Sequence, residues 1–366
     1  MITKDTGIYI HVPFCAKKCA YCDFYSEPYR KNTVEDYINA VMRNIQAYSD
    51  KACIADTIYF GGGTPSLLSP EQVGNIIQAV QNNFILTENA EITLETNPNT
   101  VDFKKLSACR KAGINRISIG LQSMIDKELK FLGRTHSAER AEKAVLDAYN
   151  AGFDNISCDV MIAIPEQSAE SLIYTLERIV ALPVKHISGY ILKIEHGTPF
   201  DCDRIKNILP DDDKTADLYI EMVDFLKNKG FLQYEVSNFA VSGYESRHNC
   251  RYWKCLDYIG IGASAHSCHN GKRFYVDRNL KDFIESPVQK ITITDDSPCG
   301  FEEYAMLRLR LAEGLNINDF PEYKNNLLKK IPALFQSGYI NYDGEYISLT
   351  PNGFLVSNSI IEYLVF

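Results

Sequence analysis

The sequence predicts an α/β fold in which parallel strands are joined by crossover helices, as an open sheet or as a complete or partial barrel. Between residue 8 and about residue 240, six short β-rich runs alternate with segments of helical periodicity. After about residue 240 the alternation stops, and helical segments followed by a hairpin indicate a smaller, winged-helix-like domain. We therefore expect a β/α domain at 1–240 and a second domain at 241–366.

The six expected strands share β-branched and aromatic residues, and they cover 8–14, 57–60, 91–95, 116–121, 155–164 and 186–194. Between the first two strands, residues 33–49 place apolar side chains on one helical face, with Thr33 as the expected N-cap. Ser69 followed by Pro70 predicts the start of the next helix. In either architecture, functional groups gather at the carboxyl ends of parallel strands.

The second domain is expected to contain helices at 301–312 and 322–337. Residues 339–349 have the pattern of a hairpin that turns at Asp343 and Gly344. A further helix is expected after Pro351. Helices with a terminal hairpin are typical of small docking domains.

Composition restricts the class of protein. The chain has 366 residues, of which 45% are hydrophobic and 23% charged, as in ordinary globular proteins. Its net charge of -9 argues against general binding to nucleic acid or membrane surfaces. No apolar run approaches the roughly 18 residues of a membrane span, which leaves peripheral contact through partners. Eleven cysteines without a visible secretory signal favour a reducing compartment, and cytoplasm is the expectation.

Three cysteines lie within eight residues, directly after the first expected strand: Cys15, Cys19 and Cys22. Structural zinc usually takes four ligands, and no clear second pair of cysteines lies nearby. A [4Fe–4S] cluster can be held by three thiolates, which leaves one iron open to another ligand. The spacing therefore favours a cluster over both zinc and simple packing of free thiols in the core.

Polar and glycine-rich segments close the following strands. These segments are 59–65, 91–98, 116–122 and 155–159, with a further polar loop at 132–136. Glycines at 61–63 allow the backbone to approach a ligand closely, although glycine-rich turns alone are common. Since carboxyl ends of parallel strands share one edge, we expect these segments to converge.

The cysteine spacing, with Tyr21 before the last thiol, resembles that of the radical S-adenosylmethionine (SAM) superfamily. Segments 9–14, 61–65, 132–134 and 196–200 together resemble the oxygen-independent coproporphyrinogen III oxidase group over nearly the whole chain. The resemblance implies a partial (β/α)6 barrel, with Cys15, Cys19 and Cys22 as ligands of a [4Fe–4S] cluster. It also implies that SAM binds at Tyr9, Tyr21, Gly62, Gly63, Thr64, Glu95, Gln122, Arg134 and Asp159.

Three of these residues suit the charged groups of SAM. The Glu95 carboxylate can accept from the methionyl ammonium, and Arg134 can pair with the methionyl carboxylate. Asp159 can accept from the ribose hydroxyls. Side-chain chemistry alone allows these partners to be exchanged among the three.

Two features distinguish branches within this group. The oxidases share a further cysteine two residues after the third, where this chain has Phe24, and they tend to carry an amino-terminal extension. The chain therefore resembles the heme-chaperone branch, which implies that it binds heme and hands it to an acceptor protein. The alternatives are SAM-dependent oxidative decarboxylation of coproporphyrinogen III to protoporphyrinogen IX and radical chemistry on an unrelated substrate.

Segment 247–253 resembles the heme-associated motif of the chaperone branch. The resemblance implies a heme site at His248, Asn249, Tyr252 and Trp253. Imidazole is a good ligand for heme iron, but a lone histidine beside aromatic residues is more often an ordinary core or surface residue. Other candidate iron ligands are Cys250, Cys255, His266 and His269.

One segment departs from the branch pattern. Ala163 and Glu166 occupy positions where the branch commonly has glycines. This departure puts the backbone shape beside Asp159 in question and leaves the cluster assignment intact.

Overall fold

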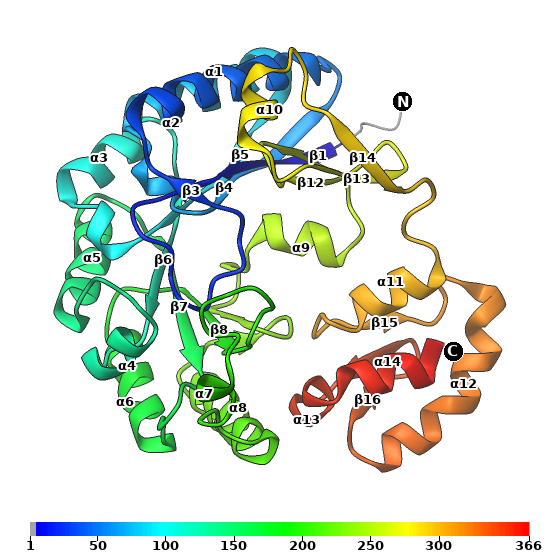
Figure 1. The fold of residues 1–366 in the computed structure, drawn as a ribbon. Coiled ribbons are helices and arrows are strands. Elements are labelled where there is room, and N and C mark those ends of the chain that lie inside the picture. Colours follow the sequence, from blue (N-terminus) through cyan, green and yellow to red (C-terminus); the bar gives the residue numbers. More distant parts are fainter. Residues whose placement is uncertain (1–4, 366) are drawn as a thin grey trace.

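The computed structural model describes residues 5–365, and within them twelve strands form one sheet (Figure 1). Six of the strands are parallel neighbours in chain order, which confirms the partial (β/α)6 barrel. These are β1 (Asp5–Val12), β4 (Ile54–Gly62), β5 (Ile85–Thr96), β6 (Arg116–Gln122), β7 (Asn155–Ile162) and β8 (His186–Ile191). All six expected strands are therefore present.

Helices follow these strands and cover the outer face of the barrel (Figure 1). They are α1 (Lys31–Ala47), α2 (Pro70–Asn83), α3 (Phe103–Lys111), α4 (Asp126–Phe131), α5 (Ala138–Asn150), α6 (Ala169–Val180), α7 (Asp203–Lys206) and α8 (Asp212–Asn228). Ser69 caps α2 in a capping box with Gln72, as the sequence indicates. The expected cap at Thr33 is wrong, because α1 begins earlier, with Arg30 at the N-cap position.

The sheet continues beyond residue 240. On one edge β11 (Tyr258–Ile261) pairs parallel to β1, and β12 (His266–His269), β13 (Lys272–Val276) and β14 (Ile291–Asp295) extend it antiparallel. On the other edge lie β10 (Asn238–Ala240) and β9 (Leu232–Gln233). The predicted boundary at residue 240 therefore precedes four strands of the sheet, and we propose that the smaller domain begins near residue 296.

Helices dominate the carboxyl-terminal part and lie beside the open side of the barrel (Figure 1). They are α11 (Phe301–Arg308), α12 (Pro321–Gln336), α13 (Pro351–Leu355) and α14 (Ser357–Val365). A small sheet joins β15 (Leu315–Asn316) to the expected hairpin of β16 (Ile340–Tyr342) and β17 (Tyr346–Leu349). α11 is shorter than expected, because Arg310 and Ala312 bond through their backbone to Val236 and Tyr234 of the barrel part.

Two short helices pack against the barrel: α9 (Arg247–Trp253) and α10 (Leu280–Glu285). β2 (Phe14–Cys15) and β3 (Glu27–Pro28) form a separate pair at the two ends of the cysteine loop. Among residues 5–365 no helix is long and apolar enough to cross a membrane.

Candidate functional site

The inner face of the barrel is polar, because polar residues or glycines stand at every second position of its strands. Alternate positions such as Ile58, Phe60, Ile117 and Ile119 belong to the hydrophobic core instead. The polar inner positions are Thr57, Tyr59 and Gly61; Glu91, Thr93 and Glu95; Arg116, Ser118 and Gly120; Ser157 and Asp159; and His186, Ser188 and Tyr190. The sequence reasoning missed Tyr59, Arg116 and Tyr190, although this period of two is visible in the sequence.

The glycines after β4 dock the cysteine loop onto the barrel. The backbone N–H of Gly63 donates to the carbonyl of Val12 at 2.9 Å, and that of Thr64 donates to the carbonyl of Phe14 at 2.8 Å. A β-carbon on Gly63 would lie 2.7 Å from the Phe14 carbonyl oxygen, so a larger residue would push the loop away. Glycine here therefore fixes the start of the loop that carries Cys15.

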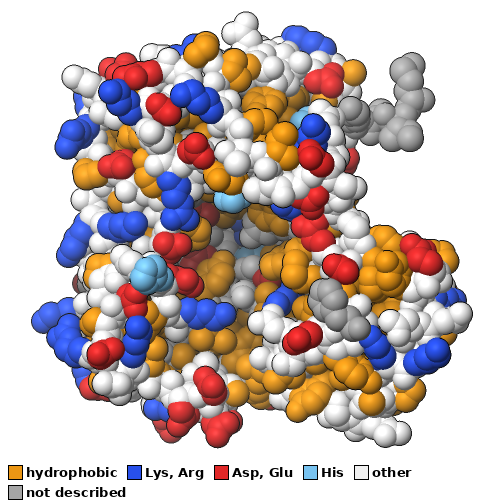
Figure 2. Space-filling view, turned by 45° about the vertical axis from the view of Figure 1, so that its right-hand side comes forward, with side chains coloured by type: hydrophobic (Ala, Val, Ile, Leu, Met, Phe, Trp, Pro, Cys, Tyr) orange, Lys and Arg blue, Asp and Glu red, His pale blue; other side chains and the backbone are white. Residues whose placement is uncertain are grey.

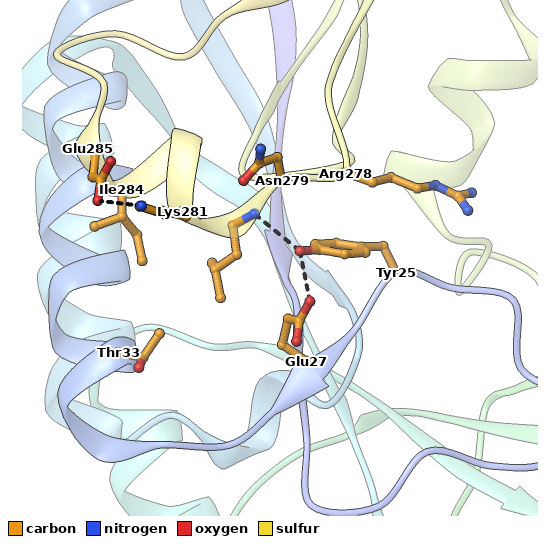
Figure 3. Close-up of a pocket in the computed structure, with 9 residues that line it drawn as sticks. Tyr25, Glu27, Thr33, Arg278, Asn279, Lys281, Ile284 and Glu285 are labelled. Atoms are coloured by element: carbon orange, nitrogen blue, oxygen red, sulfur yellow. Dashed lines mark hydrogen bonds and ion pairs between the residues drawn. The ribbon is translucent and has the colours of Figure 1, made fainter.

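The other end of this loop is tied to α10. The Tyr25 hydroxyl accepts from the Leu280 N–H at 3.1 Å and donates to Glu27 at 3.2 Å. Figure 3 shows these contacts at a surface pocket of about 470 Å³, which Arg278 and Lys281 also line. The loop is thus anchored at both ends while its middle carries the thiols.

All three predicted cluster ligands are half-buried in this loop. Cys19 Sγ lies 3.4 Å from Nη1 of Arg134, and Cys15 Sγ lies 3.5 Å from the Thr64 hydroxyl. Burial raises the pKa of the Cys22 thiol, and the charges of Cys19 and Cys15 raise it further, so the three sulfurs are neighbours. In the described part of the chain, no three His, Cys, Asp or Glu side chains are arranged to hold a single metal ion.

This donor set fits a cluster. Thiolates are the ligands of iron–sulfur clusters, and the Arg134 guanidinium lies beside Cys19. Three neighbouring thiols on one anchored loop meet the requirement of a site with one iron left open.

Glu95 lies at the carboxyl end of β5 and faces the glycine segment. One carboxylate oxygen accepts from the Tyr59 hydroxyl at 2.8 Å, and the other accepts from the Gly62 N–H at 3.2 Å. Burial raises the pKa of Glu95 to about 7, and the nearby Asp159 adds to the rise. A carboxylate with this pKa can change its charge in the physiological range.

Gln122 and Arg134 meet at the end of β6. A bulge between Gly120 and Gln122 interrupts the ladder, and Gln122 has a left-handed backbone with φ 72°. Arg134 Nη2 donates to the Gly120 carbonyl at 2.7 Å. The Gln122 Oε1 and Arg134 Nε atoms are buried without a hydrogen-bond partner. Buried polar atoms are normally paired, so these two indicate a ligand position at the rim that the carboxyl ends of the barrel strands form.

Asp159 occupies the corresponding position on β7. It pairs in register with Gly120 of β6 and Ser188 of β8, and it accepts from the Ser118 hydroxyl at 3.3 Å. Burial raises the pKa of its carboxyl group. Tyr190, 40% exposed, interacts electrostatically with Asp159 from the next strand.

The two predicted tyrosines lie at different depths. Tyr21 lies in the cysteine loop beside Arg134 and against Phe200. Tyr9 lies deeper, with its ring stacked on Tyr59 at 6.2 Å between ring centroids. The structure thus brings eight of the predicted SAM residues to one rim and places Tyr9 below it.

The structure does not bring the predicted heme residues to this rim. They belong to α9, which packs against the amino-terminal ends of β1 and β4, where His248 lies beside Thr57 and Gly7. The two backbone N–H groups that open α9, those of Arg247 and His248, donate to the Glu91 carboxylate at 3.0 and 3.1 Å. α9 therefore closes the barrel at the end opposite the cysteine loop.

His248 is fully buried and both of its ring nitrogens are engaged. Nδ1 lies 2.8 Å from the Thr57 hydroxyl, and Nε2 lies 2.8 Å from the Tyr252 hydroxyl. Burial lowers the pKa of His248 to about 3, and the charges of Arg251 and Arg116 add to the effect. The imidazole is therefore neutral, but no ring nitrogen is free for iron in this conformation.

The remaining candidate heme and iron-binding residues at the amino end of the barrel are less buried than His248. Asn249 and Trp253 are half-buried on α9, and Tyr252 packs edge-on against Tyr258 at 4.5 Å between ring centroids. Burial raises the pKa of Cys250 to about 12, which disfavours a thiolate ligand there. His269 pairs with Asp257 at 3.1 Å. These side chains do not converge on one exposed position.

The departure from glycine beside Asp159 is visible in the backbone. Ala163 and Glu166 have φ of 60° and 66°, in the left-handed region where glycine is favoured. The backbone shape is thus maintained without glycine, at a cost in strain.

Open space lies between the barrel and the carboxyl-terminal helices. Figure 2 shows this hollow, with apolar side chains along the neighbouring helices. Exposed apolar residues on these helices include Met306, Tyr323, Leu328, Phe335 and Tyr363.

Comparison with known proteins agrees with this geometry. Residues 9–179 match the Radical SAM superfamily, and residues 301–356 match the HemN C-terminal domain. The chain is 34% identical to heme chaperone HemW of Escherichia coli (strain K12), over 97% of each chain. It is 31% identical to heme chaperone HemW of Lactococcus lactis subsp. lactis, over 99% of this chain and 98% of the relative.

Among solved structures, coproporphyrinogen III oxidase (HemN) from Escherichia coli superposes with a TM-score of 0.83. The superposition covers 99% of this chain and 90% of the HemN chain, at 22% sequence identity, and so shows that the two share a fold. Because relatives more than 30% identical align with nearly its whole length, the chain belongs to the HemW family of radical SAM proteins.

Proposed function

We propose that this protein is a heme chaperone, which binds heme and transfers it to an acceptor protein. The observation that carries the proposal is its similarity to heme chaperones HemW along almost the full length of both chains. Phe24, 66% exposed beside the cysteine loop, stands where the oxidases resembled by the sequence have a further cysteine.

The rim supports a [4Fe–4S] cluster at Cys15, Cys19 and Cys22, with SAM beside it. A cluster held by these thiols would supply an electron and leave one iron open for the amino and carboxylate groups of SAM. Arg134 lies beside Cys19 and keeps one guanidinium nitrogen without a partner, so it is placed to pair with the methionyl carboxylate. Glu95 and Asp159 supply acceptors for the N–H groups of the methionyl amine and for the ribose hydroxyls.

The heme site is proposed at α9, and the burial of His248 adds a condition. Because Thr57 and Tyr252 occupy both imidazole nitrogens, iron ligation by His248 requires one contact to break, and movement of α9 away from β4 would free Nδ1 from Thr57. Asn249, Tyr252 and Trp253 would move with it. An acceptor protein can contribute to this opening, since any molecule that binds only the open form shifts the equilibrium toward it.

The function is tested by offering hemin and coproporphyrinogen III separately to anaerobically reconstituted protein. We expect stoichiometric heme binding and transfer to a heme-free globin used as the acceptor probe, with no protoporphyrinogen formed. Repeated turnover of coproporphyrinogen in the presence of SAM would make the protein an oxidase instead.

The heme site is tested by hemin titration of wild type, His248→Ala and Cys250→Ala, followed through the Soret band. We expect the band to change in His248→Ala alone. Equal binding by all three proteins would remove α9 from the heme site without removing heme binding from the protein.

A further inference from the structure

A second group of three thiols lies outside the cysteine loop. Cys255 follows α9, Cys268 lies in β12, and Cys299 lies in the linker between β14 and α11 (Figure 1). The Cys299 thiol is in hydrogen-bond contact with the thiols of both Cys255 and Cys268, and its sulfur lies 3.9 Å from the Cys255 carbonyl oxygen.

A network of polar contacts holds Cys299 against the sheet. Its backbone N–H donates to Glu303 Oε2 at 2.6 Å, and Glu303 Oε1 pairs with Arg273 Nη2 at 2.7 Å. Arg273 also donates to the Tyr258 hydroxyl at 3.2 Å. The linker is therefore fixed where it passes the end of α9, so the thiol contact is built into the fold.

Cys255 and Cys299, two of these three cysteines, both have an unusual backbone conformation. Cys255 has φ 52° and Cys299 has φ 68°, in the left-handed region that non-glycine residues rarely adopt. Cys255 stands just after the C-cap residue of α9, a position where glycine is the common residue. Such strain persists where the surroundings impose it, and it is common at functional sites.

The thiols of Cys255 and Cys299 differ in pKa. The pKa of Cys255 is lowered, chiefly because its sulfur accepts a hydrogen bond from Cys299. The pKa of Cys299 is raised to about 12 by the same contact, and the pKa of Cys268 is also raised. Cys255 is therefore the thiol of the three that ionises first, and thiolates are the form that reacts with oxidants.

We propose that Cys255 and Cys299 form a reversible disulfide when the protein meets a peroxide. The Cys255 thiolate attacks one oxygen of hydrogen peroxide, the O–O bond breaks, and proton uptake releases one water and leaves a sulfenic acid. The Cys299 sulfur attacks the sulfenic sulfur, and the S–O bond breaks with release of a second water. In total two thiols and one peroxide give one disulfide and two waters.

The bond would join the end of α9 to the linker that precedes the carboxyl-terminal helices. Cys255 and Cys299 are both half-buried rather than enclosed in the core. Tyr258, which Arg273 contacts, packs on Tyr252 of α9, so the same junction borders the helix that carries His248. The oxidised form therefore holds α9 and the linker together.

The test uses cluster-loaded full-length protein treated with one equivalent of hydrogen peroxide. Free thiols are then alkylated, and the protein is digested without reduction for mass spectrometry. We expect a peptide pair linked through Cys255 and Cys299, which disappears after treatment with dithiothreitol. Cys202→Ser, a half-buried thiol at the N-cap of α7, is the matched control and should keep the linked pair.

Cys255→Ser and Cys299→Ser should each lose the linked pair and keep the melting temperature of the reduced wild type. Full alkylation of both thiols in peroxide-treated wild type would overturn the proposal. A link between Cys268 and Cys299 instead would also overturn it, since it would assign the reactive pair differently.

Discussion

The two ends of the barrel use the same kind of polar strand residues in opposite ways. At the amino end, His248, Thr57 and Tyr252 satisfy one another, and Glu91 bonds the start of α9. At the carboxyl end, Gln122 and Arg134 keep buried polar atoms without a partner. Arg116 Nε and Arg251 Nη2 are also buried without a hydrogen-bond partner, nearer the amino end. Buried polar groups cost stability unless they are paired, so the paired group around His248 contributes stability, while the unpaired atoms beside the cysteine loop are arranged for a ligand.

Left-handed backbone occurs at both ends of the barrel, since Cys255 after α9 also has it. Gln122, Ala163 and Glu166 have left-handed backbone, and all three follow or close strands at the carboxyl end. Strain of this kind is maintained by surrounding structure and is concentrated where a site must be shaped. The comparison makes separate predictions for the two ends.

The largest expected effect is at the cysteine loop. Cys15→Ala, Cys19→Ala or Cys22→Ala should each lower reconstituted iron from about four per chain to near zero and abolish the visible absorption of the cluster. Cys202→Ala should retain it, since this half-buried thiol lies outside the loop. Zinc in place of iron at full occupancy would contradict the prediction.

Arg134 tests whether the rim binds SAM. Arg134→Ala should weaken SAM binding by about ten- to a hundredfold, because losing a charge-assisted hydrogen bond costs about 1.5–3 kcal/mol. Calorimetry on cluster-loaded protein gives the affinity, and iron content shows whether the contact to Cys19 also matters. Lys130→Ala, at an exposed position of the preceding helix, is the control. Unchanged affinity in Arg134→Ala would remove this residue from the site.

The fold was largely predictable because its signal is local. Alternating strands and amphipathic helices repeat along the sequence, and all six parallel strands were expected. The edge strands β11 to β14 were missed, since they are short and their place depends on pairing with β1 across about 250 residues. The predicted cap at Thr33 is wrong by three residues, since α1 begins after Arg30.

The site was predictable to different degrees at its two ends. Rim residues follow from one rule, since carboxyl ends of parallel strands must meet. His248 does not follow from any local rule, because its partners Thr57 and Glu91 lie far away in sequence and only folding brings them together. Its motif resembles a ligand site, while the structure shows the residue as a buried, fully bonded part of the barrel.

Thr57 tests the amino end. Thr57→Val keeps the size of the side chain and leaves His248 Nδ1 without its 2.8 Å partner. An unsatisfied buried polar group costs about 1–3 kcal/mol, so the free energy of unfolding should fall by that amount while SAM affinity stays unchanged. Thr57→Ser, which retains the hydroxyl, is the control. A loss of SAM affinity without a loss of stability would break the comparison between the two ends.

Glu95 gives the rim a pH dependence. Burial raises the pKa of Glu95 from 4.5 to about 7, so the protonated side chain stabilises the folded protein relative to the unfolded chain. This contribution to stability is fully present below pH 4.5 and is lost as the pH rises through about 7. The carboxylate form accepts a hydrogen bond from the methionyl amino group, so SAM affinity should rise by about tenfold between pH 6 and pH 8. Glu95→Gln should abolish this rise when affinity is measured across the same range. The same pH dependence in Glu95→Gln would assign it to another group.

The smallest effect is expected from the strained turn beside Asp159. Glu166 is exposed, with φ 66° and an ion pair to Lys127. Glu166→Ala and Glu166→Gly both remove the ion pair, but only glycine relieves the left-handed strain. Glu166→Gly should therefore melt above Glu166→Ala, by about 1–2 °C for a chain of this size, in thermal denaturation followed by circular dichroism. Alanine melting at or above glycine would show that this turn carries no strain, and the contrast would then rest on the unpaired polar atoms of the rim alone.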